Sequence, residues 1–257
     1  MSVRVRPAAH FTQISVYNEF MPHILLYGLI FLFITLLMTI IVLFIKNLRV
    51  MSAPKLVEAR YVALGDSYPL GEGAGRDFSW PNVLTKHLQQ KGVAISLIEN
   101  PSVLGATTQE VIEDELPSYE ASNPTFASLQ IGVNDWIHGT TKQLFKENLE
   151  TIITRMQAKL SNPHRIVLVT IPDFSVTPNG AKYAGERNAV MGIQGFNQVI
   201  KDLATEKGLV VVDIYPLSQG MKEHQELTAA DGIHPSAQEY ALWEGLILPS
   251  VLQMLQT

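Results

Sequence analysis

Short apolar runs alternate with longer segments of helical periodicity along most of this chain. Five short runs are predicted to be β-strands: they are 60–66, 94–99, 126–131, 166–171 and 209–214. Five longer segments between and after them are predicted to be helices: they are 80–90, 108–119, 141–160, 187–206 and 237–255. The pattern indicates a regular alternation of strand and helix from residue 60 to the end of the chain.

This alternation determines the predicted fold class, which is α/β. Strands separated by helices form a parallel sheet that is covered on both faces, and the nearly continuous apolar strands agree with such burial. We therefore predict a three-layer α/β/α sandwich with a mostly five-stranded parallel sheet, in a domain over residues 59–257. Ligands of such sheets bind outside the carboxyl ends of the strands, so functional residues are expected in the loops that follow strands.

The N-terminal part of the chain has a different pattern. Residues 24–45 form a run of 22 residues without a charge. As a helix this run would span about 33 Å, enough for a hydrocarbon core of roughly 30 Å. We predict one transmembrane helix over 24–45, between a tail at 1–23 and a linker at 46–58. A buried core helix and a cleaved signal peptide are the alternatives, although no small-x-small site immediately follows the run.

Charge is distributed unevenly between these two parts. The formal net charge is −5, and residues 51–257 contain 15 of the 19 basic and 23 of the 24 acidic residues, a net of −8. An acidic body repels phosphate backbones, so we expect no nucleic-acid partner. The chain has no cysteine, and its histidines lack metal-ligand spacing such as H-E-x-x-H. We therefore expect neither a metal nor another cofactor.

Two segments contain residues suited to nucleophilic catalysis. Ser67 follows the first predicted strand, in Gly-Asp-Ser-Tyr, where a strand-to-helix turn would expose its hydroxyl. His234 lies three residues after Asp231, in the loop before the last helix. This spacing would let the Asp231 carboxylate accept the Nδ1–H of His234 and leave Nε2 to take a serine proton. Each segment alone is also explained by an ordinary turn or helix cap.

Two further loops contain groups that could stabilise negative charge on a reacting oxygen. Asn134 lies in Gly-Val-Asn-Asp, just after the third predicted strand, and its side-chain amide is a candidate donor to an oxyanion. Gly105 follows the second predicted strand, where a glycine allows close approach of a ligand and offers its N–H. An Asn-Asp turn and an ordinary loop glycine are the alternatives.

In this order the motifs resemble those of the SGNH (GDSL-type) hydrolase family. They are Gly-Asp-Ser, a glycine after the second strand, Gly-x-Asn-Asp and Asp-x-x-His. The resemblance implies the flavodoxin-like sandwich of that family. It also implies that Ser67 is the nucleophile, that His234 is the general base and that Asp231 orients His234. The backbone N–H groups of Ser67 and Gly105 and the amide of Asn134 would form the oxyanion hole.

The resemblance covers residues 60–255 and implies a carboxylic ester hydrolase that forms an acyl-enzyme on Ser67. Its substrate would be a small acyl ester or a lysophospholipid-like lipid. An O-acyltransferase with the same residues and a catalytically inactive, membrane-tethered binding protein are the alternatives. Tyr68 replaces the leucine that is usual in the family motif, and we expect it to shape the pocket. The glycine-rich loop 71–75 is expected to be a mobile loop at the mouth of the site rather than a phosphate-binding loop.

Basic residues flank the predicted transmembrane helix on both sides. Those before it are Arg4 and Arg6, and those after it are Lys46, Arg49, Lys55 and Arg60. The larger number after the helix favours a cytoplasmic catalytic domain, whereas many enzymes of the resembling family face outward. The sequence therefore predicts a single-pass membrane protein, and the side of its catalytic domain stays open with a lean to the cytoplasm. Translation from Met51 would omit the helix and is a further alternative.

Overall fold

The computed structural model of the chain describes residues 13–51 and 58–256. The chain divides into two units, Met1–Lys55 and Leu56–Thr257. Residues 1–12 of the predicted tail and 52–57 of the predicted linker lie outside the described residues.

The first unit contains one long helix, α1 (Gln13–Met51). Within it, the segment Leu26–Lys46 is long and apolar enough to cross a membrane, with a mean hydropathy of 3.0, and its side chains are exposed. No other helix in the described part of the chain has this length and composition. A signal sequence near the N-terminus would have the same length and composition. The helix extends past the predicted span of 24–45 at both ends, because a helix need not end where its apolar stretch ends.

The second unit contains one parallel sheet of five strands in the order β2-β1-β3-β4-β5. The strands are β1 (Ala59–Gly65), β2 (Ile95–Glu99), β3 (Phe126–Gln130), β4 (Ile166–Val169) and β5 (Val210–Val212). Each coincides with a predicted strand to within two residues at either end. The sheet is parallel throughout, as the strand–helix alternation predicts.

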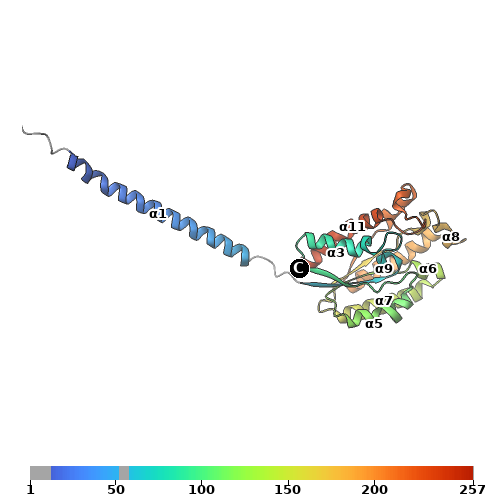
Figure 1. Cartoon of the computed structure of the whole chain (residues 1–257). Coiled ribbons are helices and arrows are strands. Elements are labelled where there is room, and N and C mark those ends of the chain that lie inside the picture. Colours follow the sequence, from blue (N-terminus) through green and yellow to red (C-terminus); the bar gives the residue numbers. More distant parts are fainter. Residues whose placement is uncertain (1–12, 52–57, 257) are drawn as a thin grey trace, which may run out of the picture. The chain divides into compact units, whose positions relative to one another are not determined.

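Helices cover both faces of this sheet (Figure 1). On one face α3 (Trp80–Gln90) packs beside α11 (Ala237–Gln256). On the other face lie α5 (Leu116–Ala121), α7 (Lys142–Lys159) and α9 (Ala189–Lys207). All described residues of β3 and β4 are buried, since apolar side chains above and below them exclude water. The predicted three-layer α/β/α sandwich is thereby confirmed.

Short helical elements connect the long ones and are mostly absent from the sequence prediction. The α-helical ones are α2 (Ser67–Leu70), α4 (Thr108–Glu110), α6 (Val133–His138), α8 (Gly180–Ala184) and α10 (Tyr215–Ser218). The 3₁₀ turns are η1 (Arg76–Phe78), η3 (Phe174–Val176), η4 (Gln219–Lys222) and η5 (Gln225–Leu227). Elements of so few residues are too short to show a hydrophobic period.

The predicted helix over 108–119 is interrupted by a π-helical turn, η2 (Val111–Glu115), which separates α4 from α5. Such a turn inserts one residue into a helix and rotates the side chains beyond the insertion. The 3.6-residue period does not reveal this insertion. Glu115, the last residue of this turn, lies with Val111 and Tyr119 on the buried side of the segment and is 1% exposed.

Candidate active site

The turn that contains Ser67 lies at the carboxyl end of β1, the strand between β2 and β3 in the sheet. Ser67 is the first residue of α2, and the Asp66 side chain caps this helix by accepting the Tyr68 N–H at 3.0 Å. Gly65 has a φ of 141°, and a Cβ there would lie 1.9 Å from the carbonyl oxygen of Gln130. Only glycine therefore lets β1 pass so close to β3 immediately before the turn.

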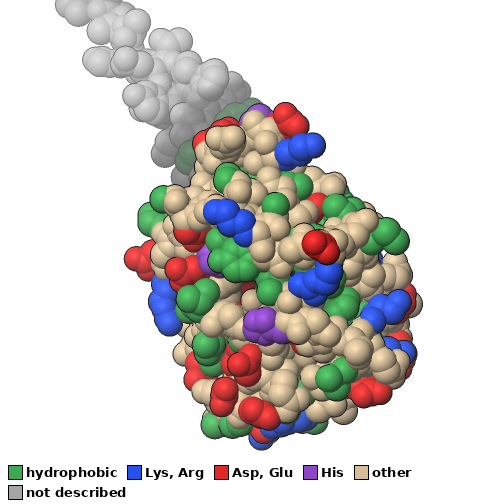
Figure 2. Space-filling view, turned by 90° about the vertical axis from the view of Figure 1, so that its right-hand side faces the viewer, with side chains coloured by type: hydrophobic (Ala, Val, Ile, Leu, Met, Phe, Trp, Pro, Cys, Tyr) green, Lys and Arg blue, Asp and Glu red, His purple; other side chains and the backbone are tan. Residues whose placement is uncertain are grey.

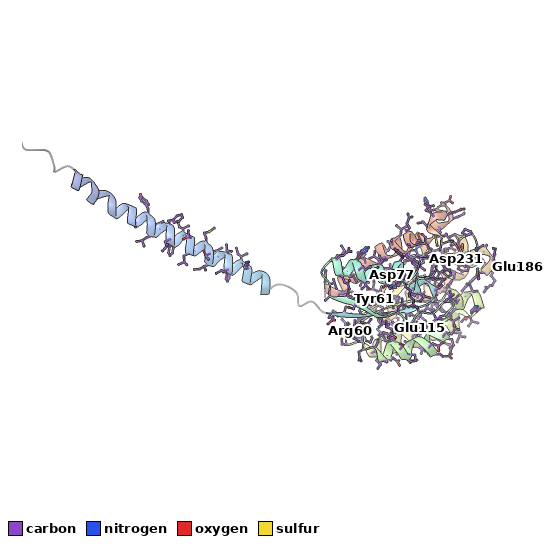
Figure 3. The ribbon with its side chains drawn as sticks, in the orientation of Figure 1. Arg60, Tyr61, Asp77, Glu115, Glu186 and Asp231 are labelled. Atoms are coloured by element: carbon purple, nitrogen blue, oxygen red, sulfur yellow. The ribbon has the colours of Figure 1, made fainter. Side chains whose placement is uncertain are left out.

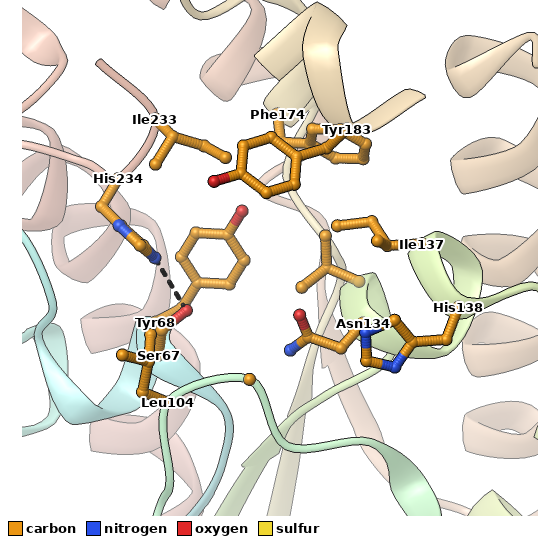
Figure 4. A pocket seen from close by; sticks show the side chains of 12 residues that line it. Ser67, Tyr68, Leu104, Asn134, Ile137, His138, Phe174, Tyr183, Ile233 and His234 are labelled. Atoms are coloured by element: carbon orange, nitrogen blue, oxygen red, sulfur yellow. Dashed lines mark hydrogen bonds between the residues drawn. The ribbon is translucent and has the colours of Figure 1, made fainter. Parts of the chain in front are cut away.

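Two residues from the last loop meet the Ser67 hydroxyl. His234 Nε2 lies 3.0 Å from Ser67 Oγ, and His234 Nδ1 lies 2.7 Å from Asp231 Oδ2; Figure 4 shows the first of these contacts. The other carboxylate oxygen of Asp231 accepts the backbone N–H groups of Ile233 and His234, both at 2.9 Å. In this arrangement Nδ1 donates to the carboxylate and Nε2 faces the hydroxyl. The structure thus brings the three predicted residues together.

The surroundings of Asp231 determine its charge. Partial burial raises the pKa of Asp231, but hydrogen bonds from Ile233 and His234 outweigh burial, so the pKa is lowered from its ordinary value. The carboxylate is therefore ionised at neutral pH. A negative charge beside Nδ1 would stabilise the positive ring that forms if His234 accepts a proton.

On the opposite side of Ser67 lie the predicted oxyanion donors. Asn134 is in the first turn of α6, and its Nδ2 donates to the carbonyl of Ala106 at 2.9 Å, which fixes the orientation of the amide. Gly105 has a φ of 83°, and no atom lies within 4 Å of a Cβ built there, so its backbone is open to the cavity. Within residues 58–256, the N–H groups of Ser67 and Gly105 have no internal acceptor. These two N–H groups and the second N–H of the Asn134 amide are therefore left to contact a bound oxygen.

A buried carboxylate connects the two loops that contain these donors. Asp135, 1% exposed, accepts the backbone N–H of Thr108 at 2.9 Å and the Thr108 hydroxyl at 2.5 Å. Thr108 begins α4, directly after the loop of Gly105, and Asp135 follows Asn134. Burial raises the pKa of Asp135 although the Thr108 bonds oppose this effect. The pair holds the Gly105 loop and the Asn134 helix at a fixed separation.

A cavity of about 290 Å³ opens beside these residues (Figure 4). Its walls are mainly apolar and include Leu104, Val133, Ile137, Phe174 and Ile233. A volume of this size lies at the small end of ligand sites in proteins. An apolar cavity that ends at a serine hydroxyl is suited to a small acyl group.

Tyr68 shapes this cavity, as the sequence prediction expects. Its ring packs edge-on against His234 and Trp243, at centroid distances of 6.1 and 5.6 Å, and its hydroxyl points toward Tyr183 in Figure 4. His138, at the end of α6, also lines the cavity. The phenol thus narrows the cavity above Ser67.

The glycine-rich loop 71–75 does not match its prediction as a loop at the mouth of the site. A Cβ at Gly73 would lie 2.7 Å from the Cβ of Ala229 and 2.8 Å from the Cβ of His234. Gly73 therefore packs directly behind the His234 loop, and it is not among the residues that line the cavity. The physical reason is that a glycine, which has no side chain, fits into a narrow space between two backbones.

Sequence reasoning missed the segment formed by Asn179 and α8, which contributes a wall of the cavity and a support for the His234 loop. Tyr183 lines the cavity and is 50% exposed. Asn179 donates its side-chain amide to the carbonyl of Asp231 at 2.6 Å, and its backbone N–H to the carbonyl of Gly232 at 2.7 Å. No local sequence signal distinguishes Asn179 from an ordinary turn asparagine.

The site lies at the opposite end of the sheet from the start of β1. In Figure 3, Arg60 and Asp231 lie at opposite ends of the second unit. Figure 2 shows this end of the unit, where acidic and basic side chains are interspersed among hydrophobic ones. Among the described residues, no group of three or more His, Asp and Glu side chains is placed to hold a metal ion.

Comparison with known proteins gives consistent results. The sequence matches the GDSL-like lipase/acylhydrolase family over residues 63–242. It is 25% identical over 135 residues to an arylesterase from Vibrio mimicus, a match that covers 52% of this chain and 64% of that enzyme. The chain thus spans slightly less than two thirds of the length of this relative.

Solved structures share the fold. An esterase from Pseudoalteromonas sp. superposes with a TM-score of 0.60 at 19% identity, over 77% of this chain and all of that one. A variant of an acetyl xylan esterase from Geobacillus stearothermophilus gives a TM-score of 0.60 at 17% identity, over 75% of this chain and 94% of that one. The resemblance to SGNH (GDSL-type) hydrolases is confirmed, and the chain belongs to the GDSL-like lipase/acylhydrolase family of carboxylic ester hydrolases.

Proposed function

We propose that this chain is a serine ester hydrolase whose domain spans residues 59–257, with Ser67 as nucleophile, His234 as general base and Asp231 as the residue that orients and stabilises His234. One observation carries the proposal. An unbroken series of contacts, 2.7 Å and 3.0 Å long, joins the Asp231 carboxylate through His234 to the Ser67 hydroxyl, and this hydroxyl borders an apolar cavity.

These contacts determine the chemistry. Ser67 Oγ attacks the carbonyl carbon of the ester while its proton passes to His234 Nε2. The bond from carbon to the alcohol oxygen then breaks, and His234 gives the proton to that oxygen. Water attacks the resulting acyl-serine ester in the same way, which releases the carboxylic acid and restores the hydroxyl.

The negative oxygen of each tetrahedral intermediate would lie between Ser67, Gly105 and Asn134. The free N–H groups of Ser67 and Gly105 and the second N–H of the Asn134 amide would donate to it. Since the Asn134 amide is held by Ala106 before substrate arrives, little reorganisation is needed when charge develops. Pre-oriented donors of this kind lower the barrier for acyl transfer.

The cavity supports a small acyl ester as substrate, or a lysophospholipid-like lipid whose acyl chain enters only in part. A space of about 290 Å³ with apolar walls favours short alkyl groups. The similar proteins include an arylesterase and an acetyl xylan esterase, whose names describe ester hydrolysis. The interspersed charges around the site favour neutral over strongly anionic substrates (Figure 2).

Hydrolysis of p-nitrophenyl esters of graded chain length by the full-length protein in detergent tests this proposal. The wild type should act best on short esters, and Ser67→Ala should lose activity and labelling by a fluorophosphonate probe. Ser161→Ala, an exposed serine away from the cavity, is the matched control. Full activity of Ser67→Ala would contradict the assignment. Absence of both activity and labelling in the wild type would favour the inactive binding protein.

An O-acyltransferase would use the same three residues, with an acceptor alcohol in place of water. The same reactions run with added glycerol or methyl glucoside distinguish the two. Free acid as the main product supports hydrolysis, and an acylated acceptor as the main product supports transfer.

We further propose that α1 anchors the enzyme in a membrane through Leu26–Lys46. This segment of 21 residues is long enough to cross a hydrocarbon core as a helix. Its two threonines do not leave their hydroxyls unpaired, because Thr35 and Thr39 donate to the carbonyls of Leu32 and Thr35 at 2.8 Å. Polar groups satisfied within the helix are compatible with lipid.

Extraction of membranes at alkaline pH and N-terminal sequencing of the product test the anchor. The protein should stay in the membrane and retain the α1 sequence. Release into solution, or a start after α1, would favour a cleaved signal peptide or translation from Met51. The basic residues after the helix favour a catalytic domain in the cytoplasm, and protease treatment of intact cells tests this. Digestion of the enzyme by protease added outside the cells would place the catalytic domain on the outer side of the membrane.

A further inference from the structure

Glu115 contacts the turn of the nucleophile from behind. It ends the π-helical turn η2, and its Oε2 accepts the backbone N–H of Gly65 at 2.9 Å. Gly65 lies two residues before Ser67, at the end of β1. Figure 3 shows Glu115 inside the second unit, against the sheet. Single π-turns occur frequently at functional sites, and this one contacts the last residue of β1, the strand that precedes Ser67.

The sheet itself cannot supply this hydrogen bond. On one side Gly65 pairs with Gln130 of β3, but on the other side the last register pair of β2 is Glu99 with Val62. Past that point the loop after β2 replaces the strand, and Val103 N donates to the carbonyl of Gly65 at 3.2 Å. Glu115 accepts the remaining N–H. The end of β1 is therefore held by one loop contact and one carboxyl group.

Glu115 also lies near the loop that contains Gly105, to which Gly65 is joined through Val103. Glu115 lines a small cavity of about 80 Å³ whose other walls include Leu104, Gly105 and Ala106. One side chain thus lies behind both the Ser67 turn and the proposed Gly105 donor. A change in its position would move both groups relative to a bound ester.

Within residues 58–256, the charged neighbours given for Glu115 are acidic and none is a cation. They are Asp66 from the start of α2, Asp114 from its own turn and Glu110 from α4. Of the cations on the adjacent helix α7, Arg155 bonds instead to Glu120 and to the carbonyl of Ile112. On β1, Arg60 bonds to the carbonyls of Ser122 and Asn123. In the described part of the chain, Glu115 Oε1 is buried without a hydrogen-bond partner.

A buried carboxylate in such a place is strongly destabilised, so the group takes up a proton. Burial raises the pKa of Glu115 to about 9, although the bond from Gly65 opposes this effect. Burial likewise raises the pKa of Asp66 to about 8. At neutral pH Glu115 is therefore a neutral acid that still accepts through Oε2.

We propose that Glu115 is a positioning residue that fixes the Ser67 turn and the Gly105 loop relative to each other, and that it acts as a neutral carboxylic acid. This inference rests on the proposed catalytic role of Ser67. Glutamine has nearly the shape of a neutral glutamic acid and keeps the acceptor for Gly65, whereas alanine removes it.

Kinetics of the full-length protein on a short p-nitrophenyl ester test the positioning role. Glu115→Gln should keep kcat within about twofold of the wild type at pH 7, whereas Glu115→Ala should lower kcat about 10- to 100-fold with little change in KM, because the reacting groups are displaced. Glu113→Gln, on the exposed side of the same turn, is the matched control. The proposal is overturned if Glu115→Gln loses as much as Glu115→Ala, or if Glu115→Ala equals the wild type.

The protonation state has its own readout. In a pH profile from 6 to 10, kcat of the wild type should fall near pH 9, and this fall should be smaller in Glu115→Gln. The infrared difference spectrum between the wild type and this variant at pH 7 should contain the C=O stretch of a protonated acid. A carboxylate signal in that spectrum, or the same pH profile in both proteins, overturns the neutral-acid form. If Glu115→Ala does not fold, these two measurements on Glu115→Gln still test the proposal.

The proposed function and this inference fail in different ways. If Ser67→Ala stays fully active, the proposed function fails. If Ser67 is essential and both Glu115 variants behave as wild type, this inference alone fails.

Discussion

Asn179 holds the backbone of Asp231 by a hydrogen bond of 2.6 Å from its side-chain amide to the Asp231 carbonyl. The two residues are 52 positions apart, and Asn179 belongs to the segment that also places Tyr183 at the cavity. The wall of the cavity and the loop with the proposed Asp231–His234 pair are therefore one connected structure.

Replacing Asn179 should loosen this loop. Asn179→Ala should lower kcat about fivefold to tenfold, because a net hydrogen bond contributes about 1 kcal/mol, and KM should change little. Steady-state kinetics on a short ester provide the measurement. Lys182→Ala is the control, since the exposed Lys182 ammonium donates to Asn179 Oδ1 at 2.7 Å and its removal leaves the Asn179 amide to bond with Asp231. Equal kinetics of Asn179→Ala and wild type would show that the loop holds its shape without this bond.

Gly73 and Gly75 form a matched pair for a steric test. Both have a left-handed φ, 85° and 89°, but a Cβ at Gly73 would contact His234 and Ala229 at under 3 Å, whereas a Cβ at Gly75 meets no atom within 4 Å. Because alanine disfavours a positive φ, the free energy of unfolding should fall by a similar amount from backbone strain in both alanine variants, about 1 kcal/mol or more.

Only Gly73→Ala should also impair catalysis, because its methyl group would push His234 away from Ser67. We expect kcat to fall by about tenfold or more in Gly73→Ala and to stay near the wild-type value in Gly75→Ala. Kinetics and thermal unfolding of both variants measure this. Equal kcat in the two variants would argue against a role of Gly73 in placing His234.

Asn134→Ala removes one proposed oxyanion donor. Loss of a single donor of this kind costs about 3–4 kcal/mol of transition-state stabilisation, so kcat should fall by two to three orders of magnitude. The fold should persist, since the amide is only partly buried and makes one hydrogen bond, to Ala106. Kinetics together with circular dichroism measure both effects. Near-normal kcat in a folded Asn134→Ala protein would remove Asn134 from the proposed oxyanion hole.

Glu239 should make stability depend on pH. It is 0% exposed, and burial raises its pKa to about 7, although a hydrogen bond from Trp243 opposes this effect. The folded state thus binds the proton more tightly than the unfolded chain, whose pKa is about 4.3. Its contribution to stability is complete below that value and is lost as pH rises through about 7.

Urea unfolding of Glu239→Gln and wild type at pH 5 and pH 8 measures this contribution. Between these values the free energy of unfolding should fall less in the variant, by on the order of 2–3 kcal/mol. The exposed Glu186→Gln is the control and should keep the wild-type difference. If the free energy of unfolding of Glu239→Gln falls between pH 5 and pH 8 by as much as that of the wild type, the assignment to Glu239 is contradicted.

The sequence by itself determined the strands, their parallel arrangement and the identity of the residues that meet at Ser67. These features are readable because they depend on local periods and on short motifs. The run Ile166–Val169, for example, is apolar on both faces, which is a property of neighbouring residues alone. Asp231 and His234 are three positions apart, so their mutual contact is also local.

Only the tertiary structure decided how distant segments fit together. The contact from His234 to Ser67 bridges 167 positions, and the roles of Gly73 and Asn179 depend on which backbone packs beside them. Glu115 lies four residues from the buried Val111 and Tyr119, so the helical period is compatible with its burial, but only the tertiary structure places its carboxyl group against Gly65. Such features arise from close packing between elements that are far apart in the chain, where the free energy depends on the neighbours that the fold supplies and not on the residue itself.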